Sequence, residues 1–319
     1  MKKSKLLITR PLEDHLLEQI QEIAQDWDVV ITDEAEQWKH HAKDTDVILG
    51  WRKFFDDSLD SLNSLKWIQT WSAGVNTLPL KELANSNVRV TSANGVHSYP
   101  ISETIFALML SLTRNIHTYI KNQAKKKWDG EDIKLEMHGK TVGVIGVGAI
   151  GKETAKIAKA FGMKVIGIRH SGKPEDHVDE MYTTDKLDEI LPECDYVVIT
   201  LPLTEETNQL FKREQFQKMK ESAFLINIGR GEIIKESDLV AALSAGEILG
   251  AGLDVFEKEP LDESSPLWEM DNCIITPHTS GSTEHYDKRV VEEIFLPNFK
   301  KFIEGQKLDI NLVDYHKGY

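Results

Sequence analysis

Two polar residues of the kinds that bind anions and transfer protons each follow a strand-like apolar run. They are Arg230 and His278, and a third such run leads into the carboxylates between Asp254 and Glu259. A guanidinium can pair with a substrate carboxylate and polarise a keto oxygen, while an imidazolium donates a proton as hydride arrives on the carbon. A carboxylate beside the imidazole fixes its orientation and stabilises its charged form. Brought to one crevice, these groups provide what reduction of a 2-oxo acid requires.

Such groups converge if the runs before them are neighbouring parallel strands, because open α/β sheets bind ligands beyond the carboxyl ends of their strands. The second half of the chain has this pattern, since amphipathic segments lie between most of its apolar runs. The runs cover residues 141–145, 165–168, 196–200, 223–227, 248–255 and 273–276. Six strands in that order predict a doubly wound, dinucleotide-binding sheet.

The first of these runs leads directly into a glycine motif, and a helical period follows it. The motif consists of Gly146, Gly148 and Gly151, with Ala149 and Ile150 before the last glycine. Its glycines suit a tight turn, a close approach of a pyrophosphate to the backbone, and close packing of helix on strand. Free N–H groups at the helix start and the helix dipole favour a negative ligand. We therefore predict that these five residues bind a dinucleotide.

The end of the second strand indicates which dinucleotide is preferred. An NAD site places an acidic residue there to hold the ribose 2′-hydroxyl, whereas this chain has Arg169, His170 and Ser171, with Lys173 close by. Arginine cannot accept a hydrogen bond from a hydroxyl, but its fork suits a phosphate. The sequence therefore predicts binding of NADP(H) in preference to NAD(H). The alternative is an ordinary solvated basic loop.

The first part of the chain shows the same alternation of apolar runs and amphipathic segments. Its runs begin at residues 6, 29, 47, 67 and 88, which predicts a parallel sheet in a first α/β domain that closes near Gly95. After the second sheet, residues 282–302 form a long helical pattern that Pro297 should kink. We expect this helix to return the chain to the first domain.

Length and charge exclude several classes of protein. The 319 residues are too many for one ordinary core and suit two domains. A formal net charge of −14 opposes binding to nucleic acid or anionic membrane. No apolar run reaches membrane-spanning length, so we expect a cytoplasmic protein. The histidines and two cysteines show no metal-ligand spacing, and we expect no metal site.

Four motifs together resemble one known family, in order and in spacing. They are residues 146–151, 227–231, 254–260 and 277–278, and the similarity to the D-isomer-specific 2-hydroxyacid dehydrogenase family covers essentially the whole chain. The family includes glyoxylate and hydroxypyruvate reductases, D-lactate dehydrogenases and phosphoglycerate dehydrogenases. The resemblance implies two doubly wound parallel-sheet domains, a Rossmann dinucleotide-binding domain and a flavodoxin-like substrate domain, with the active site in the cleft.

The resemblance also implies domain bounds and an assembly. The discontinuous substrate domain would comprise residues 1–97 plus 292–319, and the NAD(P)-binding domain residues 98–291. By analogy with the family, residues 101–128 would mediate formation of a homodimer.

Roles for individual residues follow from the same resemblance. Arg230 would bind substrate, His278 would be the acid/base and Glu259 its partner, while Asp254 would lie by the nicotinamide carboxamide. The remaining cofactor contacts implied are Leu201, Pro202, Thr207, Ile228 and Gly229.

The small residues of the loop at 71–76 offer a site for the substrate's carboxylate. Backbone N–H groups of Ala73, Gly74 and Val75 could form a nest for it. On the residues alone this loop is equally well a plain turn, and the family resemblance favours the nest. His97, Tyr99 and Arg52 are more simply interfacial or solvated than pocket-lining.

The sequence thus predicts an NADP(H)-dependent reductase that converts a small 2-oxo acid, of the glyoxylate or hydroxypyruvate type, to the D-2-hydroxy acid. One alternative is an NAD-dependent dehydrogenase of the phosphoglycerate type. Another is a non-catalytic, dinucleotide-sensing protein related to corepressors, which the complete set of Arg230, Glu259 and His278 argues against.

Overall fold

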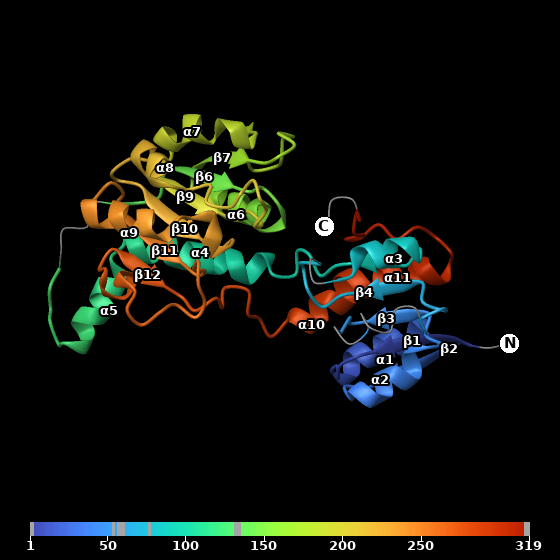
Figure 1. Cartoon of the computed structure of the whole chain (residues 1–319). Helices are drawn as coiled ribbons and strands as arrows, with labels where there is room; N and C mark the ends of the chain where they lie inside the picture. Colours follow the sequence, from blue (N-terminus) through green and yellow to red (C-terminus); the bar gives the residue numbers. More distant parts are fainter. Residues whose placement is uncertain (1–2, 53–54, 56–60, 76–77, 131–134, 316–319) are drawn as a thin grey trace. The chain divides into compact units, whose positions relative to one another are not determined.

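The computed structural model describes residues 3–52, 55, 61–75, 78–130 and 135–315, which fold as two compact units (Figure 1). Unit 1 consists of residues 1–96 and 283–319, and unit 2 of residues 97–282. The chain therefore returns to unit 1 at residue 283, nine residues before residue 292, where the sequence predicted the second segment of this domain to begin. The reason is packing, because Val290 and Ile294 join Ala93 and Val96 in one buried cluster.

Unit 1 contains a five-stranded parallel sheet with strand order β2-β1-β3-β4-β5. This is the flavodoxin-like order. The strands are β1 (Ser4–Ile8), β2 (Trp27–Ile31), β3 (Val47–Leu49), β4 (Trp67–Gln69) and β5 (Arg89–Thr91). The helices are α1 (Asp14–Ile23), α2 (Ala35–Ala42), α3 (Leu80–Asn85), α10 (Tyr286–Arg289) and α11 (Leu296–Ile303), with a π-helical segment, Val290–Phe295, before α11.

Alternate residues of the short strands pack on opposite faces of this sheet. Leu6 and Ile8 lie in a cluster with α1 and α11, whereas Leu7 lies in a cluster with α2 and α3. The ring of Trp67, which is fully buried, stacks on Phe295 with centroids 5.2 Å apart. Both faces of the sheet are therefore covered, as near-continuous apolar strands require.

Unit 2 contains a seven-stranded parallel sheet with strand order β12-β11-β10-β9-β6-β7-β8. The strands are β6 (Thr141–Ile145), β7 (Lys164–Ile168), β8 (Glu180–Tyr182), β9 (Tyr196–Ile199), β10 (Phe224–Asn227), β11 (Gly250–Leu253) and β12 (Cys273–Ile275). Six of them fall on the predicted runs, and the edge strand β8 is additional. The order reverses between β6 and β9, which defines the switch point at which such sheets bind ligands.

Helices cover both faces of the larger sheet. One face carries α4 (Ser98–Thr113) and α6 (Ala149–Ala160), and the other carries α7 (Leu187–Ile190), α8 (Arg213–Lys218) and α9 (Glu236–Ala245). Figure 1 shows α4 running beside β10 and β11, with α5 (Ile116–Ala124) beyond it. The two doubly wound sheets confirm the fold class predicted from the sequence.

The C-terminal helical pattern differs from its expected form. We predicted one helix over residues 282–302 with a kink at Pro297, but the structure begins the helix at Tyr286 and has a π-helical turn immediately before Leu296. Proline removes a backbone donor and its ring crowds the carbonyl four residues earlier, and a wider turn relieves both problems. Among the described residues, no helix has the length and apolar character needed to cross a membrane.

Candidate active site

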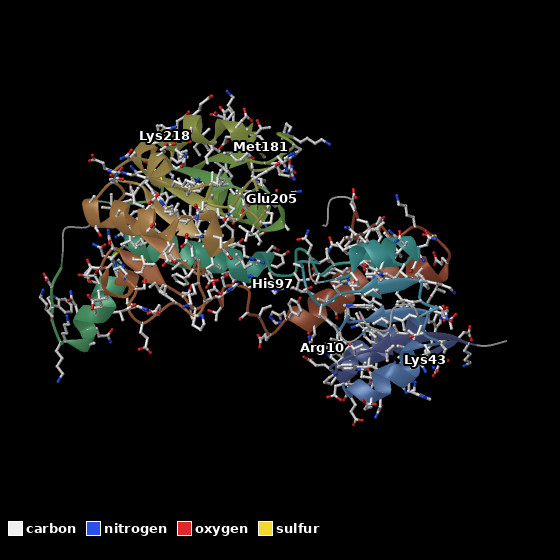
Figure 2. All side chains as sticks on the ribbon, viewed as in Figure 1. Arg10, Lys43, His97, Met181, Glu205 and Lys218 are labelled. Atoms are coloured by element: carbon white, nitrogen blue, oxygen red, sulfur yellow. The ribbon has the colours of Figure 1, made fainter. Side chains whose placement is uncertain are left out.

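The loops that leave the carboxyl ends of β6, β9, β10, β11 and β12 carry most of the predicted site residues of unit 2. The parallel strands place all five loops at one edge of the sheet. In Figure 2, Glu205 labels the loop after β9, and Lys218 labels the end of α8 at the upper left of unit 2.

The glycine motif forms a tight loop between β6 and α6. Gly146 has a φ of +114°, a conformation that favours glycine, and a Cβ on it would lie 2.9 Å from the Leu201 nitrogen. A Cβ on Gly151 would collide with the carbonyl oxygen of Gly146. Two of the three glycines are therefore required by the close packing of loop, helix and neighbouring strand.

Gly148, the middle glycine of the motif, supports binding of a pyrophosphate. It lies at the N-cap of α6, and a Cβ on it would meet nothing within 4 Å, so the space above this backbone is open. The hydrogen-bond ladder of the helix begins with Lys152 N–H donating to Gly148 O. The N–H groups of Ala149, Ile150 and Gly151 have no partner within the helix. An open cradle lined by such donors fits the phosphates of a dinucleotide.

The loop after β9 is tied to the glycine loop. Thr200 Oγ1 donates to the Gly146 carbonyl at 2.5 Å. Thr207 is buried, and its hydroxyl donates to Pro202 O at 2.7 Å and accepts from Thr204 N, so it shapes this loop from within. Leu201 is half-buried and Pro202 is exposed. Their positions beside the glycine loop are consistent with the predicted cofactor contacts.

The loop after β10 carries Arg230. Asn227 holds it, because the side-chain amide donates to Arg230 O at 3.1 Å and its oxygen accepts from Gly229 N at 3.0 Å. Ile228 is buried in the core below. Arg230 itself is exposed, and its Nη1 donates to Gly229 O at 2.7 Å. Its guanidinium therefore stands at the loop surface.

Gly231 joins this loop to the loop after β11. A Cβ on Gly231 would overlap the backbone of Phe256 and Glu257. The two chain segments are therefore in direct backbone contact, and a residue with a side chain does not fit between them. The segment with Arg230 and the segment leading to Glu259 are thus positioned against each other.

His278 and Glu259 form the closest pair among the predicted catalytic residues. His278 Nδ1 lies 2.7 Å from Glu259 Oε2, and the other carboxylate oxygen accepts from Phe256 N at 3.1 Å. Both side chains are partly exposed, at 49% and 35%. Since the carboxylate accepts the Nδ1 proton, Nε2 is the ring atom that can exchange a proton with a ligand.

Asp254 organises the turn that carries His278. It is fully buried, and its Oδ1 accepts from Thr276 Oγ1 at 2.6 Å and from Thr279 N at 3.0 Å. Its Oδ2 accepts from Ser280 N at 3.1 Å, and its carbonyl accepts from His278 N at 2.9 Å. His278 has a φ of +52°, which is unusual for a residue with a side chain. The Asp254 carboxylate, which was predicted to lie by the nicotinamide, therefore accepts hydrogen bonds from the turn that carries His278.

We expect Asp254→Asn to destabilise unit 2. An asparagine side chain would turn one NH₂ group toward backbone donors that now face a carboxylate oxygen, and each unmet buried donor costs about 1–3 kcal/mol. Urea denaturation of the full chain should show a lower midpoint. As a control, Asp176→Asn, which changes an exposed carboxylate, should stay within about 0.5 kcal/mol of the unaltered protein. Equal midpoints for the two variants would contradict the positioning role.

Arg169 follows β7 as predicted, but it is already paired. Its Nη1 lies 3.1 Å from Glu175 Oε2, and the same oxygen lies 2.7 Å from Lys152 Nζ. His170 and Ser171 are exposed in the turn that follows, and Ser171 Oγ accepts weakly from Lys173 N at 3.4 Å. The cationic groups needed for a phosphate are present, together with the carboxylate of Glu175, which the sequence pattern did not predict.

The predicted carboxylate nest belongs to unit 1. Ala73 and Gly74 are exposed and Val75 is buried. The hydrogen bonds that fold this loop use its carbonyl groups, since Ser72 Oγ donates to Gly74 O at 2.6 Å and Leu78 N donates to Val75 O at 3.0 Å. Asn76 lies outside the described residues. The exposed backbone of Ala73 and Gly74 is consistent with a nest.

Other polar residues have structural partners. His97 Nδ1 lies 2.8 Å from Gly281 O, and Arg52 Nη2 donates to Thr9 O at 3.0 Å, while Tyr99 is exposed. Over the described ranges no group of three or more histidine, cysteine or acidic residues could hold a metal ion.

Sequence reasoning missed several residues that shape the site. Lys152 directly follows the last glycine of the motif, and that adjacency was an available signal. Asn227 and Thr200 each end a strand, which is also a recognisable position. Glu175 carried no signal, because its contact with Arg169 depends on the course of the intervening turn.

Comparison with known proteins gives consistent matches along the chain. The family description "D-isomer specific 2-hydroxyacid dehydrogenase, NAD binding domain" matches residues 106–280. A glyoxylate/hydroxypyruvate reductase B of Escherichia coli is 33% identical over 324 residues, which cover 98% of this chain and 99% of that protein. A D-3-phosphoglycerate dehydrogenase of Methanocaldococcus jannaschii is 33% identical over 307 residues, which cover 95% of this chain and 58% of that protein.

Solved structures agree. A D-isomer specific 2-hydroxyacid dehydrogenase family protein from Aeromonas salmonicida superposes with a TM-score of 0.83 at 32% identity, covering 98% of this chain and all of that one. An NADPH-dependent glyoxylate/hydroxypyruvate reductase from Sinorhizobium meliloti, in complex with NADP and sulfate, has a TM-score of 0.79 at 27% identity. That match covers 99% of this chain and all of the other.

Two doubly wound parallel sheets, a glycine loop at the switch point of the larger one, and these matches define an NAD(P)-dependent oxidoreductase. Within that class, the chain belongs to the D-isomer-specific 2-hydroxyacid dehydrogenase family. The enzyme class and the family resemblance predicted from the sequence are confirmed.

Proposed function

We propose that this enzyme is an NADP(H)-preferring reductase of small 2-oxo acids of the glyoxylate or hydroxypyruvate type, and that it forms the D-2-hydroxy acid. The observation that carries the proposal is the His278 to Glu259 pair, 2.7 Å apart, at the sheet edge that also holds the glycine loop. Relatives named as glyoxylate/hydroxypyruvate reductases support the substrate class.

The proton-transfer part of the reaction is assigned to His278. Glu259 holds Nδ1, so Nε2 delivers a proton to the substrate oxygen during reduction and takes it back during oxidation. When bound, the reduced nicotinamide supplies the hydride. Asp254 acts as a positioning residue, because its carboxylate fixes the turn from which the imidazole projects.

Substrate binding is assigned to Arg230 and the backbone of Ala73 to Val75. The exposed guanidinium can pair with the carboxylate of a 2-oxo acid and can also stabilise negative charge that develops on the keto oxygen. The nest offers N–H donors that suit a carboxylate. We propose these roles from the residue types and from the family resemblance.

Cofactor preference is assigned to the Arg169 loop. We expect Arg169→Gln to raise KM for NADPH about tenfold or more and to change KM for NADH little, because only NADPH carries the 2′-phosphate. Initial rates over a panel of 2-oxo acids with each cofactor would measure both this effect and the substrate range. An unaltered enzyme that prefers NADH would contradict the cofactor proposal.

A second candidate is an NAD-linked D-2-hydroxyacid dehydrogenase of the phosphoglycerate type. The Methanocaldococcus jannaschii relative favours it, and so does the carboxylate of Glu175 beside Arg169. The same panel separates the two candidates, provided that it includes 3-phosphohydroxypyruvate.

The homodimer implied by the family resemblance stays a prediction. The exposed apolar side chains Ile116 and Ile120 of α5 and Trp128 after it are consistent with a covered surface in residues 101–128. The cytoplasmic location also stays a prediction.

A further inference from the structure

Glu175 holds together two cations that come from separate elements of unit 2. Its Oε2 lies 2.7 Å from Nζ of Lys152, in the first turn of α6, and 3.1 Å from Nη1 of Arg169, just after β7. The glutamate and the arginine are both mostly buried, with 20% and 25% of their side chains exposed. One carboxylate oxygen therefore bridges both cations.

The three charged groups surround the place where an adenosine ribose is expected. Lys152 directly follows the last glycine of the dinucleotide loop, and Arg169 stands at the position where NAD-binding proteins carry an acidic residue. The turn that brings Glu175 back begins at Arg169, whose carbonyl accepts from Gly172 N at 3.0 Å. In Figure 2, Met181 labels the edge strand β8 that borders this region.

Glu175 is ionised at neutral pH. The hydrogen bond from Lys152 and the charges of Lys152 and Arg169 hold the pKa of this carboxyl below its usual value, against the opposing effect of partial burial. The cluster therefore keeps only one net positive charge. A phosphomonoester carries about 1.5 to 2 negative charges near neutral pH, so it would compete with Glu175 for the same two cations.

We propose that Glu175 sets the balance between NADP(H) and NAD(H) by occupying Lys152 and Arg169 whenever no 2′-phosphate is bound. A 2′-phosphate has to replace the carboxylate on both cations, which weakens binding of NADP(H). With NAD(H), which carries a 2′-hydroxyl in place of the phosphate, the carboxylate stays on both cations and offsets one of their two positive charges. Lys152 is thereby a second phosphate ligand beside Arg169.

This inference rests on the proposed function only in taking the Arg169 loop as the ribose site. The proposed role of Glu175 differs from that of a purely structural ion pair in one respect. A structural pair affects all adenine nucleotides alike, whereas a competing carboxylate affects only those with a 2′-phosphate.

Binding of two nucleotide fragments to the full chain tests the inference without turnover. Adenosine 2′,5′-bisphosphate carries the 2′-phosphate, and 5′-AMP lacks it. By isothermal titration calorimetry, we expect Glu175→Gln to tighten binding of the bisphosphate about threefold to tenfold and to change binding of 5′-AMP less than about twofold. We expect 0.5 M salt to weaken binding of the bisphosphate, because counterions screen the charge of the free ligand, and to reduce the gain only in part, because Glu175 and Arg169 are mostly buried.

Glu189→Gln is the matched control. It removes the same charge from the same unit, where Glu189 pairs with Lys186 at 2.7 Å on an exposed helix face, and it should leave both fragments unaffected. Lys152→Gln should weaken binding of the bisphosphate and spare 5′-AMP. The inference would be overturned if Glu175→Gln bound 5′-AMP normally but did not bind the bisphosphate more tightly. It would also be overturned if Glu175→Gln lost binding of 5′-AMP.

The variants also separate this inference from the cofactor proposal. If Arg169→Gln does not lower the preference for the bisphosphate over 5′-AMP, the proposed NADP(H) site is wrong. If Arg169→Gln lowers it but Glu175→Gln leaves it unchanged, only the role of Glu175 is wrong.

Discussion

Replacement of His278 by alanine is expected to lower kcat for 2-oxo acid reduction by about 10²- to 10⁴-fold, the usual contribution of a positioned acid or base. We expect a large effect because the proposed acid is positioned: Glu259 Oε2 lies 2.7 Å from Nδ1, which leaves Nε2 as the ring nitrogen that can exchange a proton. Steady-state kinetics at saturating cofactor would measure it. The fold should survive, since the side chain is 49% exposed.

A second histidine provides the control for this experiment. His285 is also exposed and also lies near a carboxylate, 3.6 Å from Glu284 Oε1. His285→Ala should retain nearly full kcat. Unimpaired turnover by the His278 variant would remove that residue from the proposed role.

The second large effect is expected at Arg230. Arg230→Ala should lower kcat/KM about 10²- to 10³-fold, through a higher KM and a lower kcat, because the guanidinium would touch both the substrate carboxylate and the charge developing on the keto oxygen. Arg230→Lys should recover only part of the loss, since an ammonium lacks the planar fork. Measuring KM and kcat separately for both variants tests the two roles.

Arg213→Ala is the control for Arg230. Arg213 is exposed on α8, where its backbone N–H donates to Asp238, and its replacement should leave kinetics unchanged. If Arg230→Ala raised KM but kept kcat, Arg230 would bind substrate without stabilising the reacting oxygen.

The sheets were predictable from the sequence because their strands are short apolar runs. Every residue of β9, for example, is buried, and the sequence shows this as an unbroken run. The edge strand β8 was missed because its three residues, Glu180–Tyr182, are only half-buried and show no apolar run. The π-helical turn before α11 was missed because sequence periodicity shows where proline disturbs a helix, not how the backbone adapts.

The candidate site was predictable in its residue types but not in its contacts. The residues alone left open which of the carboxylates between Asp254 and Glu259 would meet His278, and only the resemblance selected Glu259. Asp254 is buried beneath the turn that carries His278. In this turn His278 adopts a positive φ, which no pattern of residues reveals. The ion pair of Arg169 with Glu175 likewise depends on tertiary structure.

The backbone contact at Gly231 constrains how this enzyme could be re-engineered. Because the loop with Arg230 and the loop leading to Glu259 touch there without room for even a methyl group, a shift of one displaces the other. Insertions or deletions near residues 230–232 or 256–257 would therefore displace both Arg230, the proposed anion ligand, and Glu259, the proposed partner of the acid/base. Attempts to widen substrate range should vary side chains elsewhere in the loops and keep the lengths of these two segments unchanged.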